Sequence, residues 1–287
     1  MNRLHLIVYA LLLFAICAGC NNTEATSRPI EKSGHLQQDQ PRFIVAADPQ
    51  LFRGKTEDLD RAIQSINDFE PDFLVMCGDL IETPSNLEQI SAYKSSVSKL
   101  SSDITLYNIA GNHDLGRPAK IKNIQTYQEH FGKLWYYFEH GNCLFIVLSS
   151  DILQNDRLSM NKQQKEWLID LLDKSQSGLP KQIFIFMHHP LYLNTPDEPD
   201  AYSNMPVQIR RELLGLFAKH NVQAVFSGHY HNNKINSHQG VDLITTNSIT
   251  VPMGEIAAGF RVVQVNQDRY QQNYYTIEQL EKRQVTK

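Results

Sequence analysis

The stretch FIVAADPQ, residues 43–50, is a run of apolar residues that ends abruptly in an acid, a proline and a glutamine. Two more apolar runs end in the same way, DFLVMCGD at residues 72–79 and ITLYNIAGNHD at residues 104–114. Each has the length and side-chain types of a buried strand. Amphipathic segments at residues 56–69 and 85–100 separate the runs and predict helices, the second opening with a capping box of Ser85 and Glu88. This alternation predicts a right-handed, largely parallel sheet.

The second half of the chain has a different pattern. LWYYFEHGNCLFIVLSSD, residues 134–151, predicts two antiparallel strands joined at a Gly-Asn turn. Helical patterns at residues 161–174 and 207–220 then alternate with predicted strands at residues 182–190 and 222–231. The C-terminal segment is rich in strand-forming residues and closes with a short predicted helix. The whole pattern predicts an α/β fold with both parallel and antiparallel pairing.

The composition is that of a globular domain. Of the 287 residues, 41% are hydrophobic and 20% are charged, which is enough apolar material for a sizeable core. The formal net charge of only −4 gives no basic field for binding nucleic acid.

The N-terminus has the features of an export signal. An early arginine, an apolar run at residues 6–16 and the small pair Ala-Gly before Cys20 predict a signal peptide over residues 1–19. A transmembrane anchor is the alternative, but the run is shorter than the ~20 residues needed to span a bilayer. CAGC resembles a bacterial lipoprotein signal, which implies lipidation of Cys20. Residues 20–41 are polar and predict a flexible tether before a domain over residues 42–287.

The lipoprotein resemblance implies a protein that is exported and lipid-anchored to a bacterial cell envelope, at the outer membrane or the periplasmic face. Two cysteines remain in the predicted domain, Cys77 and Cys143, each within an apolar run. We expect two buried unpaired thiols on separate strands, with a disulfide as the alternative.

Five predicted strands carry a polar cluster at their C-terminal end. The clusters are Asp48-Pro-Gln50, Gly78-Asp79, Gly111-Asn112-His113-Asp114, His188-His189-Pro190 and Gly228-His229-Tyr230-His231. Each cluster alone also has an ordinary explanation, because Gly-Asp and Gly-Asn are turn dipeptides and a lone His is more often a hydrogen-bonded polar residue than a ligand. Ligands of open α/β sheets bind outside the carboxyl ends of the strands, so five clusters at that edge predict a functional site.

The residue types in these clusters indicate the chemistry. Carboxylates, an amide and imidazoles, with no thiolate, form a mixed oxygen and nitrogen ligand set for divalent ions such as Mn, Fe or Zn. The set is too large for one closed tetrahedral site. Two ions ~4 Å apart that share a carboxylate would use it, and would activate water for in-line attack at phosphorus.

The order D-x-x…GD…GNHD…HHP…GHYH, over residues 48–231, resembles the calcineurin-like metallophosphoesterase superfamily. This resemblance implies a four-layer α/β/β/α sandwich of two mixed β-sheets. The segments ADPQ, FSGHYHNN, FRVVQV and YYTIEQL are similar to the subgroup of calcineurin-like phosphoesterase domain-containing protein 1. That subgroup is associated with serine/threonine phosphatase activity.

The resemblance also implies roles for single residues. Asp48, Gln50 and His231 would hold one metal ion, Asp79 would bridge both ions, and Asn112, His188 and His229 would complete the second site. His113 would act as general acid or phosphate donor, oriented by Asp114. His189 is expected to be structural.

Gln50 stands where most members of the superfamily have His. An amide oxygen is a harder and weaker ligand than imidazole, so we expect Mn, Fe or Mg to be favoured over Zn. The alternative is that one ion is held firmly and the second is recruited with the substrate.

The sequence leaves the substrate open. The loop over residues 191–205 and Arg117 are candidates for substrate contact, and Tyr192 and Tyr202 either line a pocket or pack the loop. The leading hypothesis is a phosphomonoesterase acting on a phosphorylated small molecule or phosphoprotein. The alternatives are a phosphodiesterase or nucleotidase, and a non-catalytic ligand-binding surface lipoprotein.

Overall fold

The computed structural model describes residues 40–51, 56–177, 181–267 and 269–285, which contain two β-sheets. The first sheet has the order β11-β10-β1-β2-β3 and the second β4-β5-β6-β7-β9-β8. The strands of the first sheet are β1 (Arg42–Ala46), β2 (Phe73–Cys77), β3 (Thr105–Ile109), β10 (Gly259–Val265) and β11 (Tyr270–Thr276). Those of the second are β4 (Tyr136–His140), β5 (Cys143–Val147), β6 (Gln182–Phe186), β7 (Val222–Ser227), β8 (Lys234–His238) and β9 (Val241–Thr245).

Both sheets have a parallel centre and antiparallel edges. In the first, β1, β2 and β3 pair in parallel, as the alternating pattern predicts, while β10 and β11 pair antiparallel. In the second, β5, β6, β7 and β9 are parallel, and β4 and β8 are antiparallel edge strands. The predicted hairpin between β4 and β5 is confirmed, with His140 opposite Cys143.

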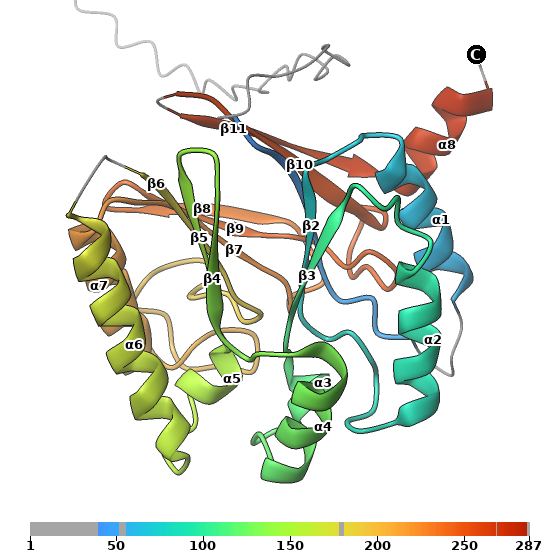
Figure 1. Ribbon diagram of the computed structural model, residues 1–287. Coiled ribbons are helices and arrows are strands. Elements are labelled where there is room, and N and C mark those ends of the chain that lie inside the picture. Colours follow the sequence, from blue (N-terminus) through green and yellow to red (C-terminus); the bar gives the residue numbers. More distant parts are fainter. Residues whose placement is uncertain (1–39, 52–55, 178–180, 268, 286–287) are drawn as a thin grey trace, which may run out of the picture. The chain divides into compact units, whose positions relative to one another are not determined.

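Helices cover the outer faces of the two sheets, which gives the four-layer α/β/β/α sandwich that the resemblance implies (Figure 1). On the first sheet lie α1 (Glu57–Asn67), α2 (Leu87–Val97) and α8 (Ile277–Val285), and on the second α6 (Ser159–Ser175) and α7 (Val207–Lys219). The four-residue helices α3 (Asn112–Leu115) and α5 (Ser150–Leu153) follow the ends of β3 and β5, and α4 (Ile121–Phe131) follows α3.

The core between the two sheets is rich in phenylalanine. Phe43 and Phe73 of the first sheet stack at 5.0 Å, and the ring of Phe145 of the second sheet packs edge-on against both. Phe184, Phe186 and Phe226 extend the same cluster. Each fully buried phenylalanine contributes about 1.5–3 kcal/mol, so this layer holds the two sheets together beneath the strand ends.

The start of α2 differs from the sequence prediction. Ser85 and Glu88 were expected to form a capping box, but the N-cap is Asn86, whose side chain accepts a hydrogen bond from the Gln89 amide. Ser85 instead has a φ of 62° and its hydroxyl donates to Asn123. The contact with a distant segment therefore outweighs the local capping pattern. The prediction for Cys77 and Cys143 is confirmed, because both are free and buried.

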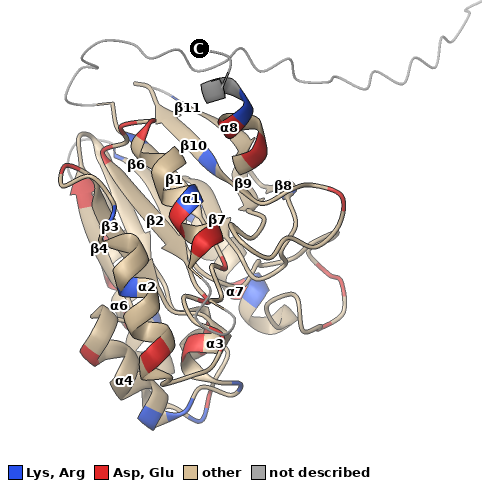
Figure 2. Ribbon diagram, turned by 90° about the vertical axis from the view of Figure 1, so that its right-hand side faces the viewer, with Lys and Arg blue, Asp and Glu red and all other residues tan. Residues whose placement is uncertain are grey.

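The predicted signal peptide, Cys20 and all but the last two residues of the tether lie outside the described residues. Within the described ranges no helix combines the length and apolar character needed to cross a bilayer. Basic and acidic residues are scattered over the ribbons rather than gathered into one basic stripe in the view of Figure 2.

Candidate metal centre

The ends of five strands bring the predicted ligands together between the two sheets. Asp48 and Gln50 follow β1, Asp79 follows β2 and Asn112 follows β3, so the first sheet supplies the oxygen donors. The second sheet supplies the imidazoles, which follow β6 and β7: His188, His229 and His231. Backbone hydrogen bonds from the Asp48 and Gln50 amides to the Gly78 and Asp79 carbonyls fix the first two ends against each other.

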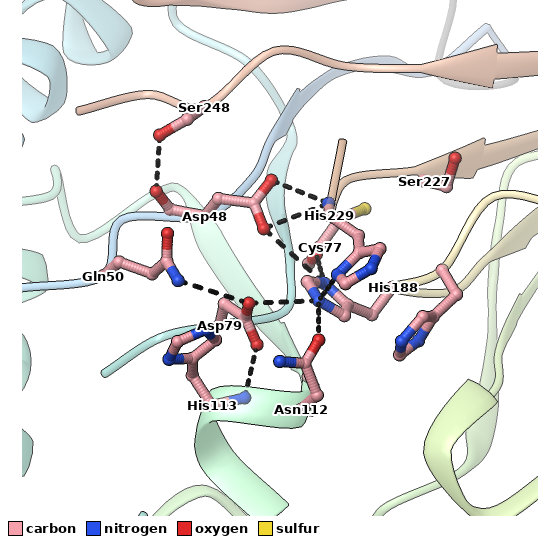
Figure 3. A network of polar contacts seen from close by, with 12 residues as sticks. Asp48, Gln50, Cys77, Asp79, Asn112, His113, His188, Ser227, His229 and Ser248 are labelled. Carbon is pink, nitrogen blue, oxygen red and sulfur yellow. Dashed lines mark hydrogen bonds and ion pairs between the residues drawn. The ribbon is translucent and has the colours of Figure 1, made fainter. Parts of the chain in front are cut away.

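Four of these side chains converge on one point (Figure 3). His188 Nε2 lies 3.2 Å from Asp79 Oδ2, 3.2 Å from Asn112 Oδ1 and 3.2 Å from His229 Nδ1. Two ligand atoms that each lie about 2.1 Å from one ion at right angles are about 3.0 Å apart. The spacing is therefore that of a ligand set around one ion.

The hydrogen bonds behind the rings fix which nitrogen of each histidine carries the proton. His188 Nδ1 lies 2.9 Å from the Cys77 carbonyl oxygen, and His229 Nε2 lies 2.8 Å from that of Tyr202. A carbonyl oxygen only accepts, so these nitrogens donate, and the lone pairs of His188 Nε2 and His229 Nδ1 face each other. Two lone pairs, a carboxylate oxygen and an amide oxygen have no hydrogen to share, so a cation fits them.

The remaining predicted ligands lie beside this cluster. His231 Nδ1 is 2.6 Å from the Val251 carbonyl oxygen, which leaves His231 Nε2 facing Asp48 Oδ1 at 3.7 Å. Gln50 is buried, and its side-chain Nε2 donates to Asp79 Oδ2 at 3.4 Å. A second group of oxygen and nitrogen donors therefore adjoins the first, with Asp79 between the two groups.

The electrostatics of the cluster favour positive charge. Burial alone would lower the pKa of His188, but the carboxylates of Asp79, Asp48 and Asp151 outweigh it and raise this pKa to about 10. Burial alone would raise the pKa of Asp79, and His188 and His113 lower it to about 2. The carboxylates thus favour positive charge at His188 Nε2, either as a proton or as a bound cation that takes its place.

The backbone at the ligands is strained. Nine non-glycine residues among the described ranges have positive φ, and five of them are predicted ligands. These five are Asp48 (53°), Gln50 (30°), Asp79 (51°), His229 (67°) and His231 (50°). A left-handed conformation at such residues costs about 1–3 kcal/mol each and is typical of functional sites. Backbone strain is therefore concentrated at the predicted ligands.

Two glycines make room for ligands from neighbouring strands. A Cβ on Gly78 would lie 2.3 Å from His188 Nδ1, and a Cβ on Gly228 would lie 2.6 Å from Asp48 Oδ2. Both distances are shorter than any real contact. Each glycine precedes one predicted ligand in the sequence and leaves space for a second ligand from another strand. A turn prediction from the sequence does not indicate this second role.

The structure corrects the role expected for Asp114. Its carboxylate does not orient the ring of His113 but accepts the backbone N–H groups of Gly111, Leu80 and Ile81 at 2.8–3.2 Å. Burial, with Asp79 nearby, raises the pKa of Asp114 to about 8. Asp114 therefore holds the β2 and β3 ends together, because a carboxylate can accept several amides at once.

Glu82, which is not among the residues predicted from the sequence, orients His113 instead. His113 Nδ1 lies 2.8 Å from the Glu82 carbonyl oxygen and 3.6 Å from the Glu82 carboxylate. The backbone N–H of His113 donates to Asp79 Oδ1 at 2.8 Å. The position of Glu82 three residues after the predicted ligand Asp79 is the feature of the sequence that could have indicated this role.

A cleft of about 330 Å³ opens over the cluster. Its lining combines predicted ligands with five further residues: Gln50, Asp79, Glu82, His113, Tyr202, His229, His231, Val251 and Met253. Tyr202 comes from the long loop, and the Asn112 amide donates to its hydroxyl at 3.1 Å.

The loop over residues 191–205 is well anchored. The Glu198 carboxylate accepts the amides of Leu193, Asn194 and Thr195, and the buried Arg210 donates to the carbonyls of Pro196, Glu198 and Met205. Tyr192 is part of the core, and its hydroxyl donates to the Ser237 carbonyl.

Arg117 and His189 lie outside the cleft lining. The Arg117 guanidinium lies 4.1 Å from the centre of the Tyr202 ring and lines an adjoining cavity of about 430 Å³ with Asp151 and Arg157. His189 is buried, accepts from or donates to the Ser150 hydroxyl at 2.8 Å, and packs against the His229 ring. It supports His229 from outside the converging donors.

Comparison with known proteins gives one consistent family. The family model for calcineurin-like phosphoesterases matches residues 41–233. A Danio rerio protein named serine/threonine-protein phosphatase CPPED1 is 31% identical over 266 residues, which cover 84% of this chain and 86% of that protein. The Homo sapiens protein of the same name is 31% identical and covers 83% of this chain and 84% of its own length.

Solved structures have the same fold. A dimetal phosphatase from Danio rerio has a TM-score of 0.63 at 16% identity and covers 83% of this chain and 97% of that one. A purple acid phosphatase from yellow lupin has a TM-score of 0.62 at 15% identity and covers 84% and 52%. At these identities the likeness is one of fold.

Proposed function

Because the chain belongs to the calcineurin-like phosphoesterase family and is a phosphoric ester hydrolase, we propose that it is a phosphomonoesterase of the serine/threonine phosphatase type. The observation that carries the proposal is the convergence of acceptor atoms from Asp79, Asn112, His188 and His229 beside a cleft that also contains His113. The relatives' names supply the substrate type. A phosphorylated side chain or small molecule would enter this cleft.

Divalent ions bound there would neutralise phosphate charge and activate water. Asp79, Asn112, His188 and His229 would hold one ion, and Asp48, Gln50, His231 and the shared Asp79 would hold the other. The backbone carbonyls behind the three histidines fix the tautomer of each ring, so that the unprotonated nitrogen faces the ion.

His113 would supply the proton to the leaving alcohol. Its Nδ1–H donates to the Glu82 carbonyl, which fixes the ring and leaves Nε2 for the cleft that His113 lines. The Glu82 carboxylate places a negative charge beside the ring when the ring is protonated. General acid catalysis of this kind contributes about 10²–10⁴-fold.

The test compares an aryl phosphomonoester with the matching bis-aryl diester, each with Mn, Fe, Mg and Zn. We expect the monoester to be preferred and His113→Gln to lose about 10²–10⁴-fold in kcat while its metal content, measured by mass spectrometry, is unchanged. A diester preference, or full activity in His113→Gln, would contradict the proposal.

We further propose that Mn, Fe or Mg is favoured over Zn, because Gln50 would offer an amide oxygen in place of an imidazole nitrogen in the second group of ligands. The measurement is the metal content of protein purified without added metal. Two tightly held zinc ions per chain would contradict this preference.

We also propose that residues 1–19 are a signal peptide, that Cys20 is lipidated, and that residues 20–41 tether a catalytic domain over residues 42–287 to a bacterial cell envelope. The support is the CAGC sequence after an apolar run. Mass spectrometry of the mature N-terminus in a bacterial host would detect the lipid. Cys20→Ala should abolish it and Cys17→Ala, the matched control, should not; an unmodified Cys20 would contradict the proposal.

A further inference from the structure

The mouth of the metal cleft is apolar. Nine large hydrophobic side chains are exposed among the described residues, and three of them line this cleft: Tyr202 (55% exposed), Val251 (44%) and Met253 (59%). Single exposed hydrophobic residues are normal, but a group at the mouth of a site marks a binding surface. We call these three residues the apolar wall.

Hydrogen bonds attach each member of the apolar wall to a predicted metal ligand. The Asn112 amide donates to the Tyr202 hydroxyl, and His229 donates to the Tyr202 carbonyl. His231 donates to the Val251 carbonyl, and the Met253 amide donates to the His231 carbonyl. The apolar wall therefore has a fixed position relative to a phosphate held over the ligands, as a specificity element requires.

The charged residues of the cleft also affect which substrates can bind. Its lining contains the carboxylates of Asp79 and Glu82, and none of the described lining residues is lysine or arginine. The guanidinium of Arg117 lies against the Tyr202 ring and lines the adjoining cavity. A second anionic group on the substrate would therefore meet Glu82 without a protein cation to pair with it.

We propose that the cleft selects phosphomonoesters whose groups next to the phosphate are apolar and uncharged, and that Tyr202, Val251 and Met253 bind these groups. This inference rests on the proposed phosphomonoesterase function. For a phosphopeptide, the preferred substrate has large aliphatic residues on both sides of the phosphorylated residue. Substrates with further phosphates or carboxylates next to the scissile group, nucleoside polyphosphates among them, are disfavoured.

The test uses two phosphoserine peptides of equal length that differ only in the flanking residues, leucine in one and aspartate in the other. The full-length protein should hydrolyse the leucine peptide with a kcat/KM about 10-fold higher, mainly through a lower KM. Met253→Gln and Val251→Thr should each reduce this ratio through KM. Ile169→Gln, on the outer helix α6 and 45% exposed, is the matched control and should leave it unchanged.

The outcomes separate this inference from the function on which it rests. Hydrolysis of p-nitrophenyl phosphate with equal rates on the two peptides, faster hydrolysis of the aspartate peptide, or no hydrolysis of either peptide overturns the inference and leaves the phosphomonoesterase proposal standing. A ratio that falls equally in Ile169→Gln also overturns it. No hydrolysis of any monoester by metal-loaded protein defeats the proposed function, and the inference with it.

Discussion

Glu82 acts on His113 in two ways, and one substitution separates them. The carbonyl of Glu82 accepts the Nδ1–H of His113 at 2.8 Å, while the Glu82 carboxylate lies 3.6 Å from the same nitrogen. Glu82→Gln removes the side-chain charge and leaves the backbone carbonyl in place. Any loss in Glu82→Gln therefore measures the charge alone.

The size of the loss follows from the geometry. Two unit charges about 4 Å apart interact by about 1 kcal/mol in water and by about 4 kcal/mol at an effective dielectric constant of about 20. The side chains of His113 and Glu82 are 29% and 31% exposed, so solvent screens much of the interaction. We expect about 1–2 kcal/mol, which corresponds to a roughly 5- to 30-fold lower kcat for Glu82→Gln.

The assay is a double-mutant cycle on an aryl monoester with metal content checked for each variant. If Glu82 acts through His113, adding Glu82→Gln to His113→Gln should change kcat by less than about 2-fold. Fully additive losses, or unchanged kcat in Glu82→Gln, would refute the assignment of the charge to the protonated ring.

Three further predictions concern other parts of the site. Gly228→Ala should weaken metal binding at least about 10-fold because its Cβ would lie 2.6 Å from a predicted ligand oxygen; Gly215→Ala, whose Cβ meets nothing within 4 Å, should bind metal normally in titrations. Arg210→Met should lower the free energy of unfolding by about 2–4 kcal/mol and expose the substrate loop to proteolysis. Arg211→Met, which loses only an exposed ion pair, should do neither. Burial raises the pKa of Asp151 to about 7, so the folded state binds more protons than the unfolded state above pH about 4. The free energy of unfolding should therefore fall as pH rises from about 4 to 7, and urea titrations of Asp151→Asn should show a smaller fall; equal slopes would contradict this.

The sequence was sufficient for features that depend on local pattern. Alternation of apolar runs and amphipathic segments predicts the parallel centre of the first sheet, and the Gly-Asn turn predicts the β4–β5 hairpin. The polar strand ends could be grouped because the carboxyl ends of parallel strands meet at one edge. Whether the grouped residues bind metal stays a prediction.

Contacts between distant segments could not be read from the sequence. Asn112 and Tyr202 are 90 positions apart. No local sequence pattern predicts that the hydroxyl of a tyrosine in a loop accepts a hydrogen bond from an asparagine at a strand end. The resemblance implies that Asp114 orients His113, whereas the Asp114 carboxylate accepts amides about 34 positions away. The same applies to Val251 and Met253, whose positions at the cleft depend on hydrogen bonds to His231.

The division of donors between the sheets has a consequence for assembly. The first sheet provides the oxygen donors and the second the imidazoles, so neither sheet alone can complete the site. A bound ion would be a cross-link between the two halves of the sandwich, and its affinity would report how closely they dock. During synthesis the last imidazole arrives with His231, so metal loading must follow the emergence of most of the chain. Substitutions in the phenylalanine layer, such as Phe43→Leu, would then loosen metal binding without touching a ligand.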